Sequence, residues 1–352
     1  MTRTDSVDNP SSRRGGWLSK ITGRIAAVAL ILASPGAEAQ EGQGSPPPQG
    51  DSSGSAPPEP ETVRPPPSPR PRVLFDVGSA YTFPAEVKGT TGRMASTLVR
   101  GAIVLLVPVN RQLAFSFPLD AGATFYDFTG DPKLVPEGGT TWATTRFFSI
   151  GAQTRYRFDE HWTLFVGVNG ASAGSRGADF GKTLTGGGGA GFTYSFSRKL
   201  TLGVGIAVQT RPASGVFVLP FPILDWELPF DEGHWHLVVG AQRTGSARVA
   251  GAAVVYSPMA QLSISAGLAL TGLGRDFRLS STGAHPNAVG RDTAFPLLLS
   301  SDWRPIRILS ITAYVGVSVF RNITLLDQDG NTLGDHDVAP ALLLGGGLSL
   351  IL

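Results

Sequence analysis

Histidine offers the widest choice of chemistry at neutral pH, and the sequence holds five: His161, His234, His236, His285 and His336. A hydrolase would need a serine paired with one of them. The first three lie next to short turns, and the last two lie in loops where no serine partner is evident. His234 and His236 would share one face of a strand and could ligate a metal, but we favour two polar residues at a rim. The sequence therefore does not predict an enzyme.

A second candidate site is the acidic loop near the C-terminal end, which contains Asp327, Asp329, Asp335 and Asp337. Calcium is bound by several carboxylate and carbonyl oxygens, so a calcium site in an outer loop is one interpretation. The loop departs from EF-hand spacing, because it has no acidic residue at the first position and no closing glutamate. We therefore expect a solvated loop, without a resident metal or other cofactor.

Composition excludes several other kinds of site. The chain has no cysteine, which rules out a disulfide framework, a thiol nucleophile and a cysteine-ligated metal. The glycine runs at 186–189 and 345–347 are not phosphate loops, since no Lys-Ser/Thr follows them; in strands they permit bends or close approach. The formal net charge is only +2, so we expect no nucleic-acid partner.

Residues 1–39 have the order of a secretory signal peptide. A positive region comes first, formed by Arg13, Arg14, Lys20 and Arg24. A short apolar run at 25–33 follows, and Ala37-Glu38-Ala39 provides a cleavage site. The apolar run is too short to span a membrane as a helix. A twin-arginine signal is an alternative, because the Arg-Arg pair precedes Trp-Leu at nearly the usual spacing.

Residues 40–72 form a second region of different composition. It holds 11 of the 27 prolines, together with Gly, Ser and Gln, and almost no aliphatic residue. Such a segment cannot bury enough apolar area to offset the entropy of ordering, so we predict a disordered periplasmic spacer. The alternatives are a ligand for a proline-reading periplasmic partner or an anchor in the cell wall.

Residues 73–352 alternate between aliphatic and small or polar residues with a period of two. The segments 113–125, 201–208, 262–270 and 309–319 show this most clearly. Each should therefore be a strand with one aliphatic face. The segments run to roughly 10–14 residues, longer than an average soluble strand of about 5–6 and close to the 9–11 of a tilted membrane strand. This length and the bare aliphatic face favour membrane strands over a soluble sandwich.

Membrane strands must close into a barrel, because lipid offers no partner for the N–H and C=O groups of a sheet edge. Short turns alternate with longer loops, one of them expected at 321–337, which is the arrangement of outer-membrane barrels. We predict an all-β, transmembrane, antiparallel up-and-down β-barrel of 14 strands, with 12 as the alternative. Aromatic residues near the expected strand ends suit interface girdles: Trp142, Tyr156, Trp162, Trp226, Trp235, Tyr256 and Trp303. The partners would be lipid of a Gram-negative outer membrane and the barrel assembly machinery.

The small and polar faces of the strands would line the interior of this barrel. The charged residues expected there are Asp76, Arg100, Asp120, Arg155, Asp225 and Glu227. Charges of both signs are compatible with a water-filled passage, as porin lumens are polar. They are equally compatible with pairing across a blocked interior.

Three segments of the C-terminal part carry a resemblance to a known family. They are LPFPIL at 219–224, VYSP at 255–258 and DHDVAPAL at 335–342. With them, the region from 219 to 352 resembles the DUF6268-type uncharacterised outer-membrane β-barrel family. The resemblance implies fold and location, and it brings no catalytic residue. One departure is the end of the chain, LSLIL, where outer-membrane barrels usually carry an aromatic residue.

These features predict a passive channel or small-solute passage. The alternative is a structural or partner-binding barrel without transport, acting through its loops or the proline-rich segment. A transporter of long-chain apolar solutes is a third hypothesis. It would need an N-terminal plug, whereas only the predicted spacer precedes the barrel.

Overall fold

The computed structural model describes residues 70–131, 134, 142–213, 215–229, 234–244, 247–270, 276–282 and 285–352. The predicted signal peptide, and all of the predicted spacer except its last three residues, lie outside these ranges. Within the described ranges, no helix is both long enough and apolar enough to cross a membrane.

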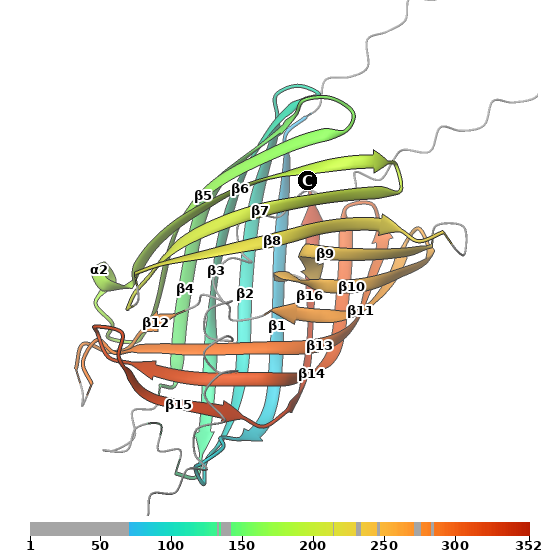
Figure 1. The fold of residues 1–352 in the computed structure, drawn as a ribbon. Helices are drawn as coiled ribbons and strands as arrows, with labels where there is room; N and C mark the ends of the chain where they lie inside the picture. The colour runs from blue at the N-terminus through green and yellow to red at the C-terminus, as the bar shows by residue number, and fades with distance from the viewer. Residues whose placement is uncertain are drawn as a thin grey trace, which may run out of the picture.

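Fourteen antiparallel strands form the wall of a closed barrel (Figure 1). In chain order they are β1 (Arg72–Glu86), β2 (Arg93–Pro108), β3 (Leu113–Thr129), β4 (Thr144–Arg157), β5 (Trp162–Ser175), β6 (Leu184–Ser197), β7 (Leu200–Arg211), β8 (Gly215–Glu227), β9 (Trp235–Thr244), β10 (Ala247–Met259), β11 (Leu262–Leu270), β13 (Val289–Ile306), β14 (Leu309–Leu326) and β16 (Ala341–Ile351). Neighbouring strands pair, and β16 pairs with both β14 and β1, which closes the sheet. The predicted all-β barrel of 14 strands is confirmed, and the alternative of 12 is wrong.

Two further strands extend this ring without adding to its count. β15 (Thr332–Val338) pairs with β14 directly beyond β16, so β15 and β16 are two halves of one wall strand. The interruption falls at Ala339–Pro340, where proline has no N–H for the ladder. β12 (Phe277–Arg278) lies in the β11–β13 connection, and the single-turn helix α2 (Phe180–Thr183) lies between β5 and β6.

The long loop that we expected at 321–337 is wrong. Residues 321–326 continue β14 and pair with β15, and only 327–331 form a turn. The turn is stabilised by Asp327, whose carboxylate accepts hydrogen bonds from the backbone N–H groups of Asp329 and Asn331. The alternation of polar and apolar residues therefore continues to the end of β14, and β14 is longer than a membrane crossing requires.

The two ends of the barrel differ. At one, the terminus end, the backbone N–H of Val73 donates to the carbonyl of Leu352 over 2.9 Å. The opposite, loop end carries the longer connections.

Along the wall, aliphatic side chains such as Val168 and Val204 are 61% and 52% exposed on the outside, whereas Asp76 and Asp120 are 4% exposed on the inside. An apolar outer face of this extent requires lipid around it.

Exposed tryptophans gather at the terminus end. Trp162, Trp226 and Trp303 stand at the terminus-end tips of β5, β8 and β13, with Trp303 51% exposed. This position suits the aromatic girdle that we predicted. Trp142 is different, and its expected place in the girdle is wrong, because it is only 3% exposed and packs edge-on against Phe277 at the loop end.

The glycines of β6 and β7 make room for aromatic rings inside the barrel. A Cβ atom on Gly191 would lie 2.3 Å from Cζ of Phe165, and one on Gly205 would lie 2.1 Å from Cζ of Phe221. The two rings lie 6.5 Å apart and pack with Ala207 and Phe217 on the inner wall. The glycine-rich strands β6 and β7 therefore leave room for an apolar lining of aromatic side chains on this side of the barrel interior.

We expect Gly205→Ala to lower the free energy of unfolding by about 1–3 kcal/mol, because the Phe221 ring must leave its position. The measurement is a urea unfolding curve in lipid vesicles. Gly170→Ala is the matched control, because a Cβ atom there meets nothing within 4 Å. Adding Phe221→Leu to Gly205→Ala should restore most of the lost stability. Equal losses of stability in Gly205→Ala and Gly170→Ala would contradict this packing.

Candidate functional site

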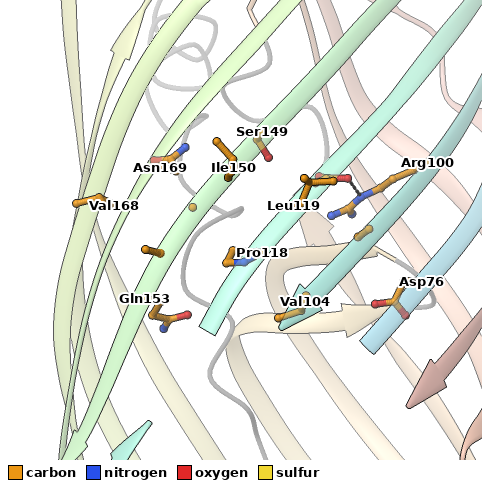
Figure 2. Close-up of a pocket in the computed structure, with 14 residues that line it drawn as sticks. Asp76, Arg100, Val104, Pro118, Leu119, Ser149, Ile150, Gln153, Val168 and Asn169 are labelled. Atoms are coloured by element: carbon orange, nitrogen blue, oxygen red, sulfur yellow. Dashed lines mark hydrogen bonds and ion pairs between the residues drawn. The ribbon is translucent and has the colours of Figure 1, made fainter. Parts of the chain in front are cut away.

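Polar side chains from the first five strands meet inside the barrel in what we call the polar pocket (Figure 2). Its polar members are Asp76, Arg100, Asp120, Ser149, Gln153 and Asn169. The strand register places them together, since Arg100 stands opposite Gly122 and Asp120 stands opposite both Ala102 and Ser149. Three of the six charged residues that we expected in the lumen therefore lie within one small region.

A buried ion pair forms the centre of the polar pocket. Nε of Arg100 lies 2.7 Å from Oδ1 of Asp120, and both side chains are almost fully buried. The other carboxylate oxygen of Asp120 has no hydrogen-bond partner among the described residues. Asp76 accepts a hydrogen bond from the Ser349 hydroxyl on β16. The pocket thus holds two carboxylates and one guanidinium, a formal excess of one negative charge.

The other three residues of the expected lumen set lie nearer the terminus end, and the structure does not bring them to the pocket. Oε1 of Glu227 lies 2.9 Å from Nζ of the largely exposed Lys199. Oδ1 of Asp225 lies 3.7 Å from Nδ1 of His236. Arg155 sits two residues beyond Gln153 on β4, toward the same end. Solvent screens the most exposed of these charges, the Asp225 carboxylate.

The loop end is crossed by a segment that we call the crossing segment, Asp276–Ser281. Within it, β12 pairs with β13 through Phe277 and with β5 through Arg278. In the ring of fourteen, β5 and β13 are seven strands apart in either direction. The backbone N–H of Ser281 also donates to the carbonyl of Gly177, beyond the end of β5. The segment therefore spans the mouth, beside α2 (Figure 1).

Two arginines hold the crossing segment in place. Arg278 donates from Nε to the carbonyl of Lys182 over 3.2 Å, from Nη1 to that of Asn287 over 2.7 Å, and from Nη2 to that of Pro212. Asp276 accepts two hydrogen bonds of 2.7 Å each from Arg291 of β13. Bidentate pairs of this kind fix geometry as well as charge. The segment is thereby tied to the wall strand β13 at Asp276, and to α2 and two connections at Arg278.

Beneath the crossing segment lies an apolar group that we call the mouth cluster. Its members are Ala85, Val87, Met94, Leu134, Trp142, Phe277, Leu279, Ala288, Ile323, Leu325, Val338 and Ala341. Trp142 makes an edge contact with Phe277 at 5.1 Å between ring centroids and another with Tyr126 at 5.8 Å. The cluster joins β1, β2, β14, β15 and β16 to three connections. It fills the mouth with buried side chains.

A third buried ion pair lies on the inner side of the mouth cluster. Asp292 accepts hydrogen bonds from Arg321 at 2.9 Å and 2.6 Å and from the Tyr126 hydroxyl at 3.1 Å. Arg321 also donates to Ser96 over 3.0 Å. Sequence reasoning missed these residues because Arg321 fell in an expected loop. The alternation of 321–326 was the signal that would have placed it on a strand.

The weak metal candidates do not converge. Asp327 is occupied by Asn331, whose side chain donates over 2.7 Å; this bond and the backbone N–H donors hold the pKa of Asp327 below its usual value. Asp335 and Asp337 accept from Asn322 on the neighbouring strand. Within the described part of the chain, no three His, Cys, Asp or Glu side chains are grouped to hold a metal ion.

Three of the five histidines have a ring nitrogen within hydrogen-bond distance of a backbone carbonyl. His161 at the terminus end has Nδ1 2.7 Å from the carbonyl of Ser195, and His234 has Nδ1 2.7 Å from the carbonyl of Ser257. His336 lies at the loop end, with Nε2 3.2 Å from the carbonyl of Leu134. These partners are backbone carbonyls, which orient a ring without activating a hydroxyl.

No protein-family model matches the chain, and no curated protein matches its sequence. The resemblance to the DUF6268-type family therefore stays a prediction. Among solved structures, the chain is similar to the COG4313 outer membrane channel from Pseudomonas putida F1, with 12% identity, 84% of this chain and 99% of that chain covered, and a TM-score of 0.41. It is also similar to the TodX deltaS2S3 mutant monoaromatic hydrocarbon channel (10%, 80% and 90%, 0.42) and the KdgM porin (7%, 78% and 98%, 0.31). These low-identity likenesses transfer no residue roles.

Proposed function

We propose that the protein is an outer-membrane barrel that forms a passage for small solutes, with the loop end outside and the terminus end in the periplasm. The observation that carries this proposal is the contrast between the two faces of the wall. Aliphatic side chains are exposed on the outside, while charged and amide side chains are gathered inside at the polar pocket. A lumen lined in this way suits water and small polar species.

The polar pocket supports a passage because burying its charged side chains lowers the stability of the folded protein. Two buried charges lose their hydration, and an apolar pair of similar volume often serves stability as well or better. The inner wall at β5–β8 is lined by phenylalanine instead, so a wall strand of this barrel can pack without charged residues on its inner face. Charged residues in the lumen are thus explained more simply by a role in solute passage than by a role in the stability of the wall.

A structural or partner-binding barrel is the second candidate, and the closed mouth favours it. The free space among the side chains of the polar pocket is about 30 Å³, which is room for about two water molecules. A passage therefore requires the crossing segment and some lining side chains to move. We propose in addition that residues 1–39 direct export and that residues 40–72 are a spacer that can contact a periplasmic partner.

We expect discrete current steps from the folded protein in planar lipid bilayers. Asp76→Asn should shift the ion selectivity toward anions, because it removes one of the two carboxylates of the polar pocket, where low-dielectric walls focus the field. Asp225→Asn is the matched control, since this carboxylate is exposed and screened. Silence from protein whose folding is shown by its gel shift on heating would favour the second candidate.

A further inference from the structure

A separate chamber lies between the mouth cluster and the polar pocket. It has a volume of about 160 Å³ and is lined by residues of β1–β5, β12–β14 and β16. Most of its lining is apolar, including Leu98, Phe147, Leu298 and Leu343. An apolar cavity of about 150 Å³ holds one benzene ring. The chamber is thus of the right size for a molecule built on a single ring.

Two buried hydrogen-bond donors among the lining residues have no acceptor in the part of the chain that the structure describes. Arg321 is 5% exposed, and its Nη1 has no hydrogen-bond partner among the described residues, although its Nε and Nη2 are bonded. Ser318 is 4% exposed, and its hydroxyl likewise has none in the described ranges. A β-bulge between the two positions turns both side chains inward. Buried donors without acceptors are costly, so an acceptor at this place would be well bound.

The charges around the chamber select the sign of that acceptor. Both oxygens of Asp292 are already bonded, to Arg321 and Tyr126. A ligand cation would therefore compete with Arg321 for the carboxylate. An anionic oxygen would instead receive a charge-assisted hydrogen bond from the free Nη1 position.

We propose that the chamber binds a small, single-ring carboxylate, with its ring against the apolar lining and its carboxylate bonded by Arg321 Nη1 and Ser318 Oγ. The inference rests on the proposed function, because the chamber lies on the passage that we propose. It adds the chemical class of the solute. A bound carboxylate would sit directly below Phe277, at the base of the mouth cluster.

The test is calorimetric titration of the folded full-length protein in detergent with benzoate and, in parallel, with benzylamine. The two probes have similar rings and opposite charges. We expect benzoate to bind with one site per chain and benzylamine to bind at least tenfold more weakly. Equal affinity for the two probes would overturn the proposal, because the ring alone would then account for binding.

Ser318→Ala removes one donor and leaves the Arg321 network intact, so it should fold and weaken benzoate binding about tenfold, the effect of one hydrogen bond to a charged group. Ser300→Ala is the control, since Ser300 is also a buried inward serine but bonds to Ser265. The double variant Arg321→Met with Asp292→Leu should abolish the difference between benzoate and benzylamine. Wild-type benzoate affinity in Ser318→Ala and in the double variant would refute the assignment.

Bilayer recordings of the same preparations separate this inference from the proposed function. Protein that binds benzoate but never conducts would refute the passage and keep the binding site. Protein that conducts but shows no benzoate binding would keep the passage and refute the binding site.

Discussion

Replacing both Phe277 and Leu279 by alanine is expected to raise the single-channel conductance several-fold. Both side chains are buried in the mouth cluster and anchor the crossing segment. Truncations of this kind cost roughly 2–5 kcal/mol each, because they remove the apolar contacts that hold the segment together with the hydrogen bonds of Arg278 and Asp276. The wall ladder does not include these residues, except where β12 pairs with the tip of β13. The segment should therefore detach while the barrel stays folded.

The matched control for this prediction is Phe217→Ala with Leu219→Ala. These residues have the same types and are also packed on the inner face, but they belong to the lining of β8 and not to the mouth. The measurement is conductance in planar bilayers, with folding checked by the gel shift on heating. Equal conductance of the mouth variant and wild type would show that the crossing segment does not close the path.

Asp120→Ala should lower the free energy of unfolding by about 3–5 kcal/mol, because it leaves the buried Arg100 charge without compensation. The double variant Arg100→Met with Asp120→Leu should recover nearly all of this loss, since it removes both charges and keeps their volume. Urea unfolding in vesicles measures both effects.

The control for the ion-pair prediction is Glu227→Ala, which breaks an ion pair with an exposed lysine at the terminus end. Exposed pairs contribute about 0–1 kcal/mol, so this variant should be close to wild type. If Asp120→Ala is as mild as Glu227→Ala, water reaches the polar pocket freely and the lumen is open there. That result would favour a permanently open channel over the closed state described above.

The alternation of apolar and polar residues along the chain was enough to predict much of the fold. The period of two in residues 73–352 predicted strands, their apolar face and a barrel of 14, because side chains alternate across any strand whatever its neighbours. The same pattern put Asp76, Arg100 and Asp120 on the small and polar face. The prediction from this pattern was least accurate where paired strands continue beyond the length of a membrane crossing. Residues 321–337 were therefore assigned to a loop, although residues 321–326 alternate.

Only the tertiary structure decided how the interior is filled. No local pattern brings Trp142 to Phe277, or Arg278 to Gly174, because these contacts join segments more than a hundred residues apart through the closure of the sheet. The ion pairs of Arg100 and Arg321 likewise depend on the register between strands, which single strands do not specify. The sequence by itself therefore determined a lipid-facing barrel with a polar lumen, and the packing of loops into that lumen determined its closed mouth and its chamber.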